Sequence, residues 1–144
     1  MSQTEVRRGL RIRCDEGLEP EIRRACLEFA SWLRNEFEFP IRVVVYIKKD
    51  DQIKNTTTKE LVSGTFFAPF DKKGEPYIRV AAGDYNRVLK AAGRDEALAV
   101  ILGTIAHELG HYYQWVDGKD LNEEGAENNS EYLLDLYSQT RDHP

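Results

Sequence analysis

The stretch ILGTIAHELGHYYQW, residues 101–115, determines how the whole sequence is interpreted. Most of its side chains are apolar, and they lie all round a helix, so this helix is expected to be buried. His107, Glu108 and His111 fall within one arc, because four helical residues turn by about 40°. Burying these polar groups without partners is costly. The arc must therefore face a polar or charged partner.

These three residues form the pattern His-Glu-x-x-His. Two imidazoles one helical turn apart can bind one Zn²⁺, and the intervening glutamate faces the water on the metal. Zinc lowers the pKa of such a water to about 7, so a glutamate there can take its proton. We therefore expect a zinc site with His107 and His111 as metal ligands and Glu108 as the catalytic base. A buried structural helix with hydrogen-bonded histidines is the alternative.

The composition is that of an ordinary soluble globular protein, with 41% hydrophobic and 31% charged residues. A chain of 144 residues fits one domain, 1–144, around a single core. The net charge of −5 argues against a dedicated nucleic-acid binder. No apolar run is long enough to span a bilayer, and no apolar signal segment follows the first residues, so we expect neither a nucleic-acid nor a membrane partner. A cytoplasmic location with reduced Cys14 and Cys26 is the resulting expectation.

The order of expected elements indicates an α+β fold. Alternating residues in GLRIRC and a β-branched run at 41–49 predict two strands, separated by a helix that starts near Pro20. Residues 50–60 read as a polar loop, and LVSGTFFAP and PYIRVAA as a hairpin. Helices are expected at 83–93, 95–115 and 121–140. A stripe of small residues on the long helix, Gly103, Ala106 and Gly110, predicts close approach of a neighbouring element.

The His-Glu-x-x-His helix, placed after the GTFFAP…PYIRVA hairpin, resembles the zincin metallopeptidases over roughly residues 41–140. The short distance to the downstream glutamates is similar to that in the minimal gluzincins, including the ImmA/IrrE-like peptidases. The resemblance implies a small mixed β-sheet of about four strands. This sheet would pack on the N-terminal helix, the His-Glu-x-x-His helix and a C-terminal glutamate helix.

A catalytic zinc site needs a third protein ligand. The metzincin pattern would supply Asp117, but it requires a glycine where this chain has Gln114. The segment Glu127-Asn-Asn-Ser130-Glu131 resembles the thermolysin-type glutamate helix, which implies that Glu127 is the ligand and that Glu131 orients a histidine. Glu123 and Glu131 each lie one helical turn from Glu127. The alternatives to Glu127 therefore remain Glu131, Glu123, Glu124 and Asp117.

The expected function is zinc-dependent hydrolysis of a peptide bond in a selected protein substrate, with Glu108 activating the water. The strand near 64–67 would pair with an extended substrate, as the resemblance implies. A zincin-like metal-binding interaction module with little turnover is the main alternative. A deformylase-type amide hydrolase is a further one, although its upstream Glu-Gly-Cys motif is missing. The oxyanion donor is left open among Tyr112, Tyr113, Tyr132 and Tyr137.

Overall fold

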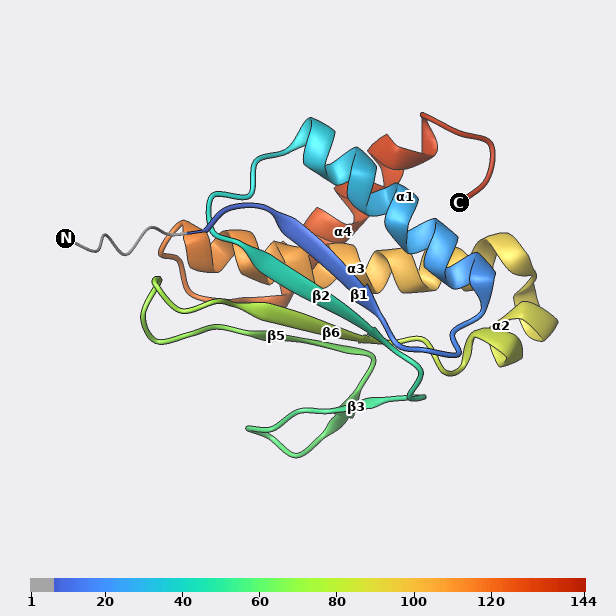
Figure 1. Ribbon diagram of the computed structural model, residues 1–144, viewed down its shortest axis with the longest axis horizontal. Helices are drawn as coiled ribbons and strands as arrows, with labels where there is room; N and C mark the ends of the chain where they lie inside the picture. The colour runs from blue at the N-terminus through green and yellow to red at the C-terminus, as the bar shows by residue number, and fades with distance from the viewer. Residues whose placement is uncertain (1–6) are drawn as a thin grey trace.

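The computed structural model describes residues 7–144, and its elements form an α+β fold with one mixed four-stranded sheet (Figure 1). The order across this sheet is β1 (Leu10–Cys14), β2 (Val43–Lys48), β6 (Tyr77–Ala81) and β5 (Gly64–Phe67). β1, β2 and β6 are parallel, whereas β5 runs antiparallel to β6 at one edge. The expected α+β class, the mixed sheet of about four strands and the β5–β6 pair are confirmed.

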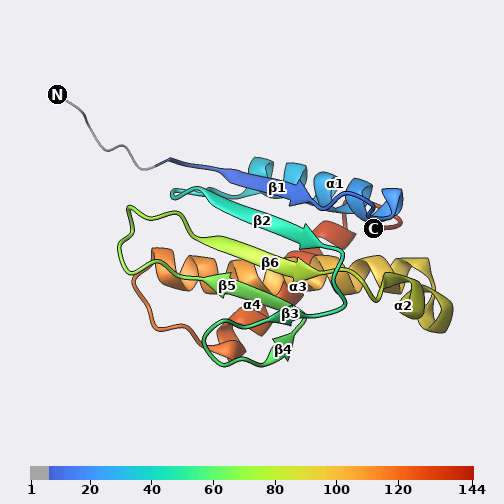
Figure 2. The ribbon, with the colours of Figure 1, turned by 60° about the horizontal axis from the view of Figure 1, so that its bottom comes forward.

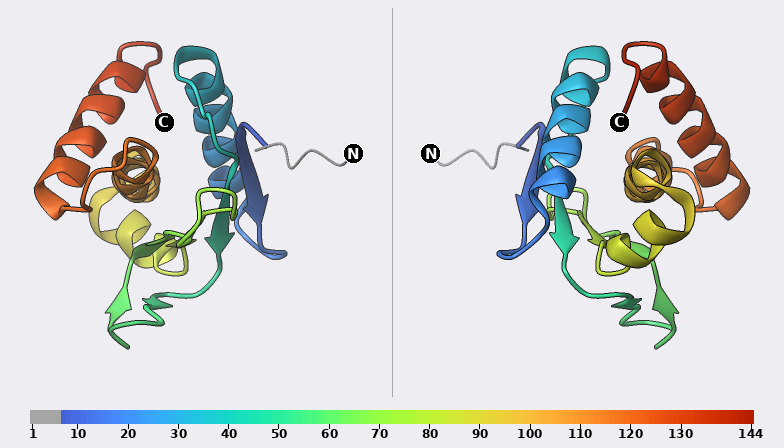
Figure 3. Two further views of the ribbon diagram at one scale, coloured as in Figure 1. Left: turned by 90° about the vertical axis from the view of Figure 1, so that its left-hand side faces the viewer. Right: turned by 90° about the vertical axis from the view of Figure 1, so that its right-hand side faces the viewer.

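The helices of residues 7–144 all lie on one side of the sheet (Figure 2 and Figure 3). They are α1 (Pro20–Glu36), α2 (Tyr85–Ala92), α3 (Arg94–Val116) and α4 (Glu123–Ser138). α1 and α3 pack directly on the strands, α4 packs on α3 from outside, and α2 packs on α3 beyond the ends of the strands. The core contains alternate residues of the strands, such as Val45 and Ile78, together with the apolar faces of α1 and α3. α3 is buried almost all round, as its sequence predicts.

The polar segment 50–60 is only partly the loop that its composition predicts. Ile53–Lys54 forms β3, which pairs with β4, Leu61–Val62, in a separate two-stranded ribbon (Figure 2). The Asn55 side chain accepts hydrogen bonds from the backbone N–H groups of Thr57 and Thr58 and so holds the turn. The expected single strand over LVSGTFFAP is therefore two short strands, β4 and β5, which pair with different partners.

α4 lies unusually close to α3 because the stripe of small residues removes side chains from the contact. A Cβ atom at Gly110 would come within 2.7 Å of the Ala126 Cα. Asn129 Nδ2 donates to the Ala106 carbonyl over 2.8 Å, and Ser130 Oγ donates to the Gly103 carbonyl over 3.0 Å. These contacts confirm the expected close approach, and they fix the position of α4 along α3.

Replacing each of the two glycines of this stripe by alanine should change the stability of the protein differently. Gly110→Ala should lower the free energy of unfolding by about 1–3 kcal/mol, since the new methyl group meets main-chain atoms of α4. At Gly103 the nearest atom is the end of the flexible Leu134 side chain, 3.3 Å away. Gly103→Ala should therefore be neutral or raise stability by up to about 1 kcal/mol, the gain in helix propensity. Urea unfolding measures both; equal effects would contradict the tight contact at Gly110.

Candidate metal centre

α3 presents both histidines of the motif to a cleft between α3, α4 and β5. The His107 side chain is 19% exposed and the His111 side chain 8%. Their rings are 5.3 Å apart, and Glu108, between them in sequence, is buried. The cleft has a volume of about 890 Å³ and is also lined by residues of the β3–β4 ribbon. The rings and Glu108 therefore share one solvent-connected space.

Glu123, in the first turn of α4, bridges the two imidazoles. Its Oε2 lies 2.9 Å from His107 Nε2, and its Oε1 lies 2.8 Å from His111 Nε2. The possible ligand atoms of these three residues all lie within 4.8 Å of one another. Two imidazole nitrogens and one carboxylate oxygen are a common ligand set for zinc. The geometry thus brings together the donor atoms that a metal ion needs.

The Nδ1 atom of each ring lies within hydrogen-bond distance of a second side chain. Glu127 Oε2 lies 3.0 Å from His107 Nδ1, where it accepts a hydrogen bond when Nδ1 carries the proton. Gln114 Oε1 lies 3.0 Å from His111 Nδ1. The amide of Gln114 is oriented by Asn122, whose N–H donates to Oε1 and whose carbonyl accepts from Nε2. Gln114 therefore offers an acceptor to His111, and this fixes Nδ1 as the protonated nitrogen.

This arrangement needs positive charge, either on the two rings or between them. With each Nδ1 donating its proton outward, a neutral imidazole presents an Nε2 lone pair to the Glu123 carboxylate. A carboxylate is also an acceptor, and two acceptors do not attract each other at 2.8–2.9 Å. A proton on each ring, or one metal ion shared by all three groups, resolves the conflict. A metal-binding histidine usually donates a hydrogen bond from its other ring nitrogen to a carboxylate, a backbone carbonyl or a water molecule.

The charges in the cleft shift the pKa values of its groups in a consistent pattern. Burial alone would lower the pKa of His107, but the charge of Glu108 and the hydrogen bond to Glu127 raise it. Partial burial would raise the pKa of Glu123, but its contacts with the two imidazoles lower it. Glu123 is therefore held ionised, in the form that binds a cation.

Burial raises the pKa of Glu108, although the two imidazoles partly oppose this effect. The small size of Gly64 brings β5 close to this carboxyl group: a Cβ there would lie 3.3 Å from Glu108 Cγ and 2.6 Å from Thr104 Cγ2. A carboxylate with a raised pKa is a better proton acceptor than one in water. Glu108 is thus a buried carboxyl group with a raised pKa beside the two imidazoles.

The structure separates the candidates for third ligand. Glu123, an alternative in the sequence interpretation, lies at the Nε2 atoms; Glu127, the preferred ligand, lies at the opposite nitrogen of His107. Glu127 therefore contacts the outer nitrogen of a histidine, which is the role that the resemblance implied for Glu131. Glu131 lines the cleft but is not one of the three clustered residues. Asp117 caps the end of α3. The preferred residue and the one found at the Nε2 atoms are one helical turn apart on α4, and the residue at which α4 begins decides between them.

Two further residues of the site carry no motif signal. Asn122 is the N-cap of α4, where its side chain accepts from the Gly125 N–H over 2.7 Å, and Gln114 links it to His111. A cap residue immediately before two glutamates is the one sequence signal that marks Glu123 as a first-turn residue. Of the candidate oxyanion donors, the Tyr112 and Tyr113 hydroxyls donate to backbone carbonyls of Ile41 and Glu38, outside the cleft. None of the four tyrosines lines the cleft.

Comparisons of the chain with protein-family models, with curated proteins and with solved structures found no match. Within the described residues, no helix is both long and apolar enough to cross a membrane.

The ligand assignment predicts different effects of three neighbouring glutamates. Glu123→Ala should abolish stoichiometric zinc binding, because it removes a group that contacts both Nε2 atoms. Glu127→Ala should weaken it by about 10–100-fold, the usual effect of losing a group that orients a ligand. Glu124→Ala, one residue away and exposed, is the matched control and should bind like the wild type. Chelator-competition titration measures all three; a greater loss in Glu127→Ala than in Glu123→Ala would reverse the assignment.

Zinc affinity should also depend on pH, because protons compete for the imidazoles. The pKa of His107 is raised above 6.5, so competition should begin above that pH and reduce affinity by up to about tenfold per pH unit for each displaced proton. Glu127→Gln removes one cause of the raised pKa, so its loss of affinity should begin at lower pH. Titrations between about pH 8 and about pH 5.5 test this. Identical profiles for the variant and the wild type would contradict the role given to Glu127.

Proposed function

We propose that this protein is a zinc-dependent metallopeptidase with a small zincin-like fold. The observation that carries the proposal is the combination of two parts in one cleft. His107, His111 and Glu123 offer a metal ligand set, and buried Glu108 beside them has a raised pKa. A purely structural metal site has no need of such a base. The resemblance of the motif to the minimal gluzincins supports the same conclusion.

The residues present fit a catalytic zinc ion. Three protein ligands are typical of catalytic zinc, since the fourth position is then left for water or substrate, whereas structural sites have four. When bound, zinc supplies a Lewis acid that polarises a carbonyl group and makes water more acidic. His107, His111 and Glu123 would hold it. Glu127 and Gln114 would keep the two rings in the tautomer that presents Nε2.

Glu108 is the proton carrier in this proposal. Its carboxylate takes a proton from the attacking water and passes it to the nitrogen of the leaving amine. Burial against β5 and α3 raises its pKa, which strengthens it as a base and fits it to hold the proton between the two transfers. The close approach of Gly64 limits the space around Glu108, so the carboxylate is restrained toward the cleft.

β5 supplies the surface that would orient a peptide. It is an edge strand of the main sheet, and Gly64, Thr65 and Phe66 line the cleft. An extended peptide can add to such an edge through its backbone groups, which holds a scissile bond in line with the site below. Only an unfolded or extended segment can adopt this position. The substrate class that follows is a flexible segment of a protein.

The function predicts that one carboxylate is essential while a neighbour in the same cleft is not. Glu108→Gln should lower peptide cleavage by about 10²–10⁴-fold and leave zinc content unchanged, since this side chain moves a proton and holds no metal. Glu131→Gln makes the same chemical change elsewhere in the cleft and should stay within a few-fold of wild type. Mass spectrometry of a digested peptide library measures cleavage.

The zinc-loaded wild type decides between this function and its alternative. Cleavage that depends on Glu108 supports the peptidase. Stoichiometric zinc with no cleavage of any peptide, or equal cleavage by wild type and Glu108→Gln, would reject it and favour a metal-binding interaction module.

A further inference from the structure

The face of the main sheet opposite the helices is basic and aromatic. The four strands contain four basic residues, Arg11, Arg13, Lys48 and Arg79, and no acidic residue. Residues that alternate with these, such as Ile12 and Ile78, point into the core on the helix side. Strand geometry therefore puts all four cations on the opposite face. Within residues 7–144, no helix covers this face (Figure 3), although β3 contacts β6 and the Lys54 carbonyl accepts a hydrogen bond from Arg79 Nη2.

Three aromatic rings lie next to one another among these cations. The register places Tyr46 opposite Arg79 on one side and Arg13 on the other. Tyr77 pairs with Phe67 across the β5–β6 ladder, and their rings stack with centroids 4.9 Å apart. The rings of Tyr46 and Tyr77 meet edge to face at 6.1 Å. Phe67 is 45% exposed, which is unusual for a large apolar side chain.

The centre of the face is hollow. Tyr46, Lys48, Tyr77 and Arg79 line a wide-open surface depression of about 310 Å³. The Nε atom of Arg79 is buried and has no hydrogen-bond partner in the described chain, although its Nη2 donates to the Lys54 carbonyl. Because this Nε atom has almost no exposed surface, a ligand does not reach it, and the case for an anionic ligand rests on the charges of the side chains around it.

The ion pairs also favour a negatively charged ligand. Lys48 is paired with Asp15 over 3.2 Å. Arg11, Arg13 and Arg79 form no ion pair with any residue of 7–144. Three cations without a carboxylate partner on one small face create a local positive field in a chain whose net charge is −5.

We propose that this sheet face binds single-stranded nucleic acid. This role departs from the expectation drawn from the net charge, because the local charge of this face is opposite in sign to that of the whole chain. Bases stack on exposed aromatic rings of a sheet, while phosphates contact the arginines between them. Exposed Phe67 offers the ring face for a base, and Tyr77 supports it by stacking from behind. In the neighbouring cross-strand row, Arg13 and Arg79 flank Tyr46. The site uses none of the metal-centre residues, so it is independent of the proposed peptidase function.

Other polyanions fit this face less well. An acidic peptide could add as a strand only at the β1 or β5 edge, because the backbone groups of β2 and β6 are paired on both sides, and a strand at either edge would not lie over Tyr46 and Arg79. The side chains of an acidic peptide also have no flat surface that would stack on aromatic rings. A duplex keeps its base faces stacked inside the helix and cannot present them to Phe67. Unpaired bases match both the rings and the cations.

Fluorescence anisotropy with labelled single strands of about twelve nucleotides, one oligothymidine and one oligouridine, tests the proposal. At about 50 mM salt, binding in the micromolar range is expected, and log affinity should fall with log salt with a slope of about −2 for three phosphate contacts. The DNA and RNA strands together show whether the 2′-hydroxyl is recognised.

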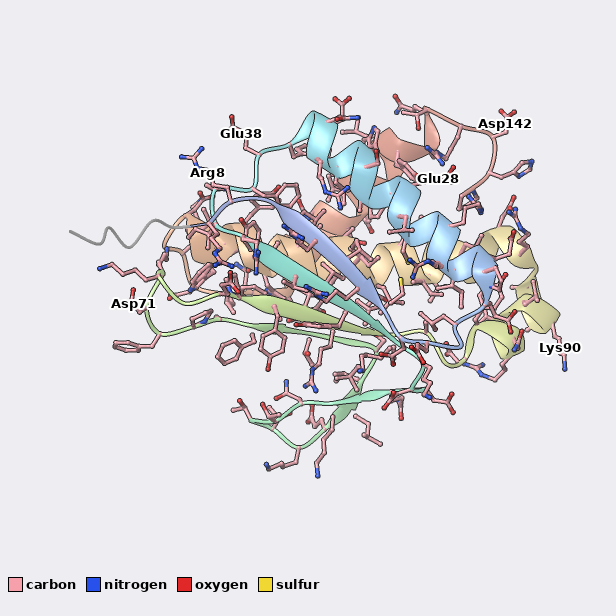
Figure 4. The ribbon with its side chains drawn as sticks, in the orientation of Figure 1. Arg8, Glu28, Glu38, Asp71, Lys90 and Asp142 are labelled. Atoms are coloured by element: carbon pink, nitrogen blue, oxygen red, sulfur yellow. The ribbon has the colours of Figure 1, made fainter. Side chains whose placement is uncertain are left out.

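The variants separate stacking from charge. Phe67→Ala and Tyr77→Leu should each weaken binding by about tenfold without changing the salt slope, whereas Arg13→Ala should weaken it and reduce the slope. Lys90→Ala is the control, since Lys90 extends from the end of α2 away from the sheet (Figure 4). Phe67 and Arg13 are exposed, so these variants fold even if Tyr77→Leu does not.

Three results would overturn the proposal. They are no binding of either strand at low salt, binding that Lys90→Ala weakens as much as Arg13→Ala does, and equal or tighter binding of a labelled oligoglutamate or a DNA duplex. Loss of zinc by chelation should leave strand binding unchanged, so failure here is distinguishable from failure of the peptidase proposal.

Discussion

The contact of α4 with α3 at Gly110 determines which carboxylate faces the two imidazoles. Because no side chain separates the helices there, Ala126 sits directly on α3, and the first turn of α4 is carried over the histidines. Asn129 and Ser130 fix the same helix to α3 carbonyls further along. A shift of α4 by one turn would exchange Glu123 for Glu127 at the Nε2 atoms. The chemistry of the cleft therefore depends on a packing contact outside it.

Much of the fold follows from local sequence signals. The buried α3, the end of α2 at Gly93 and the β5–β6 pair were all predictable, since periodicity and glycine turns are local properties. The β3–β4 ribbon was not. Its strands have two residues each, and they form because the Asn55 turn brings them together, which no periodicity reveals.

The candidate site likewise has one part that the sequence predicts and one part that depends on tertiary contacts. His107, Glu108 and His111 lie on one helix, so their spacing alone predicts their geometry. The third carboxylate comes from another helix, whose register on α3 is set by tertiary contacts. Sequence spacing cannot distinguish positions one turn apart on such a helix. The two glutamates differ in the ring nitrogens they contact: Glu123 lies at both Nε2 atoms, and Glu127 at Nδ1 of His107.

The central claim is that His107, His111 and Glu123 hold one metal ion. The most direct measurement is an anomalous difference map from crystals of the zinc-loaded protein, recorded at the zinc absorption edge. The account predicts one strong peak about 2.0–2.2 Å from both Nε2 atoms and from a Glu123 carboxylate oxygen, with Glu127 on His107 Nδ1. A peak bound by Glu127 in place of Glu123, or no peak between the two histidines, would contradict it.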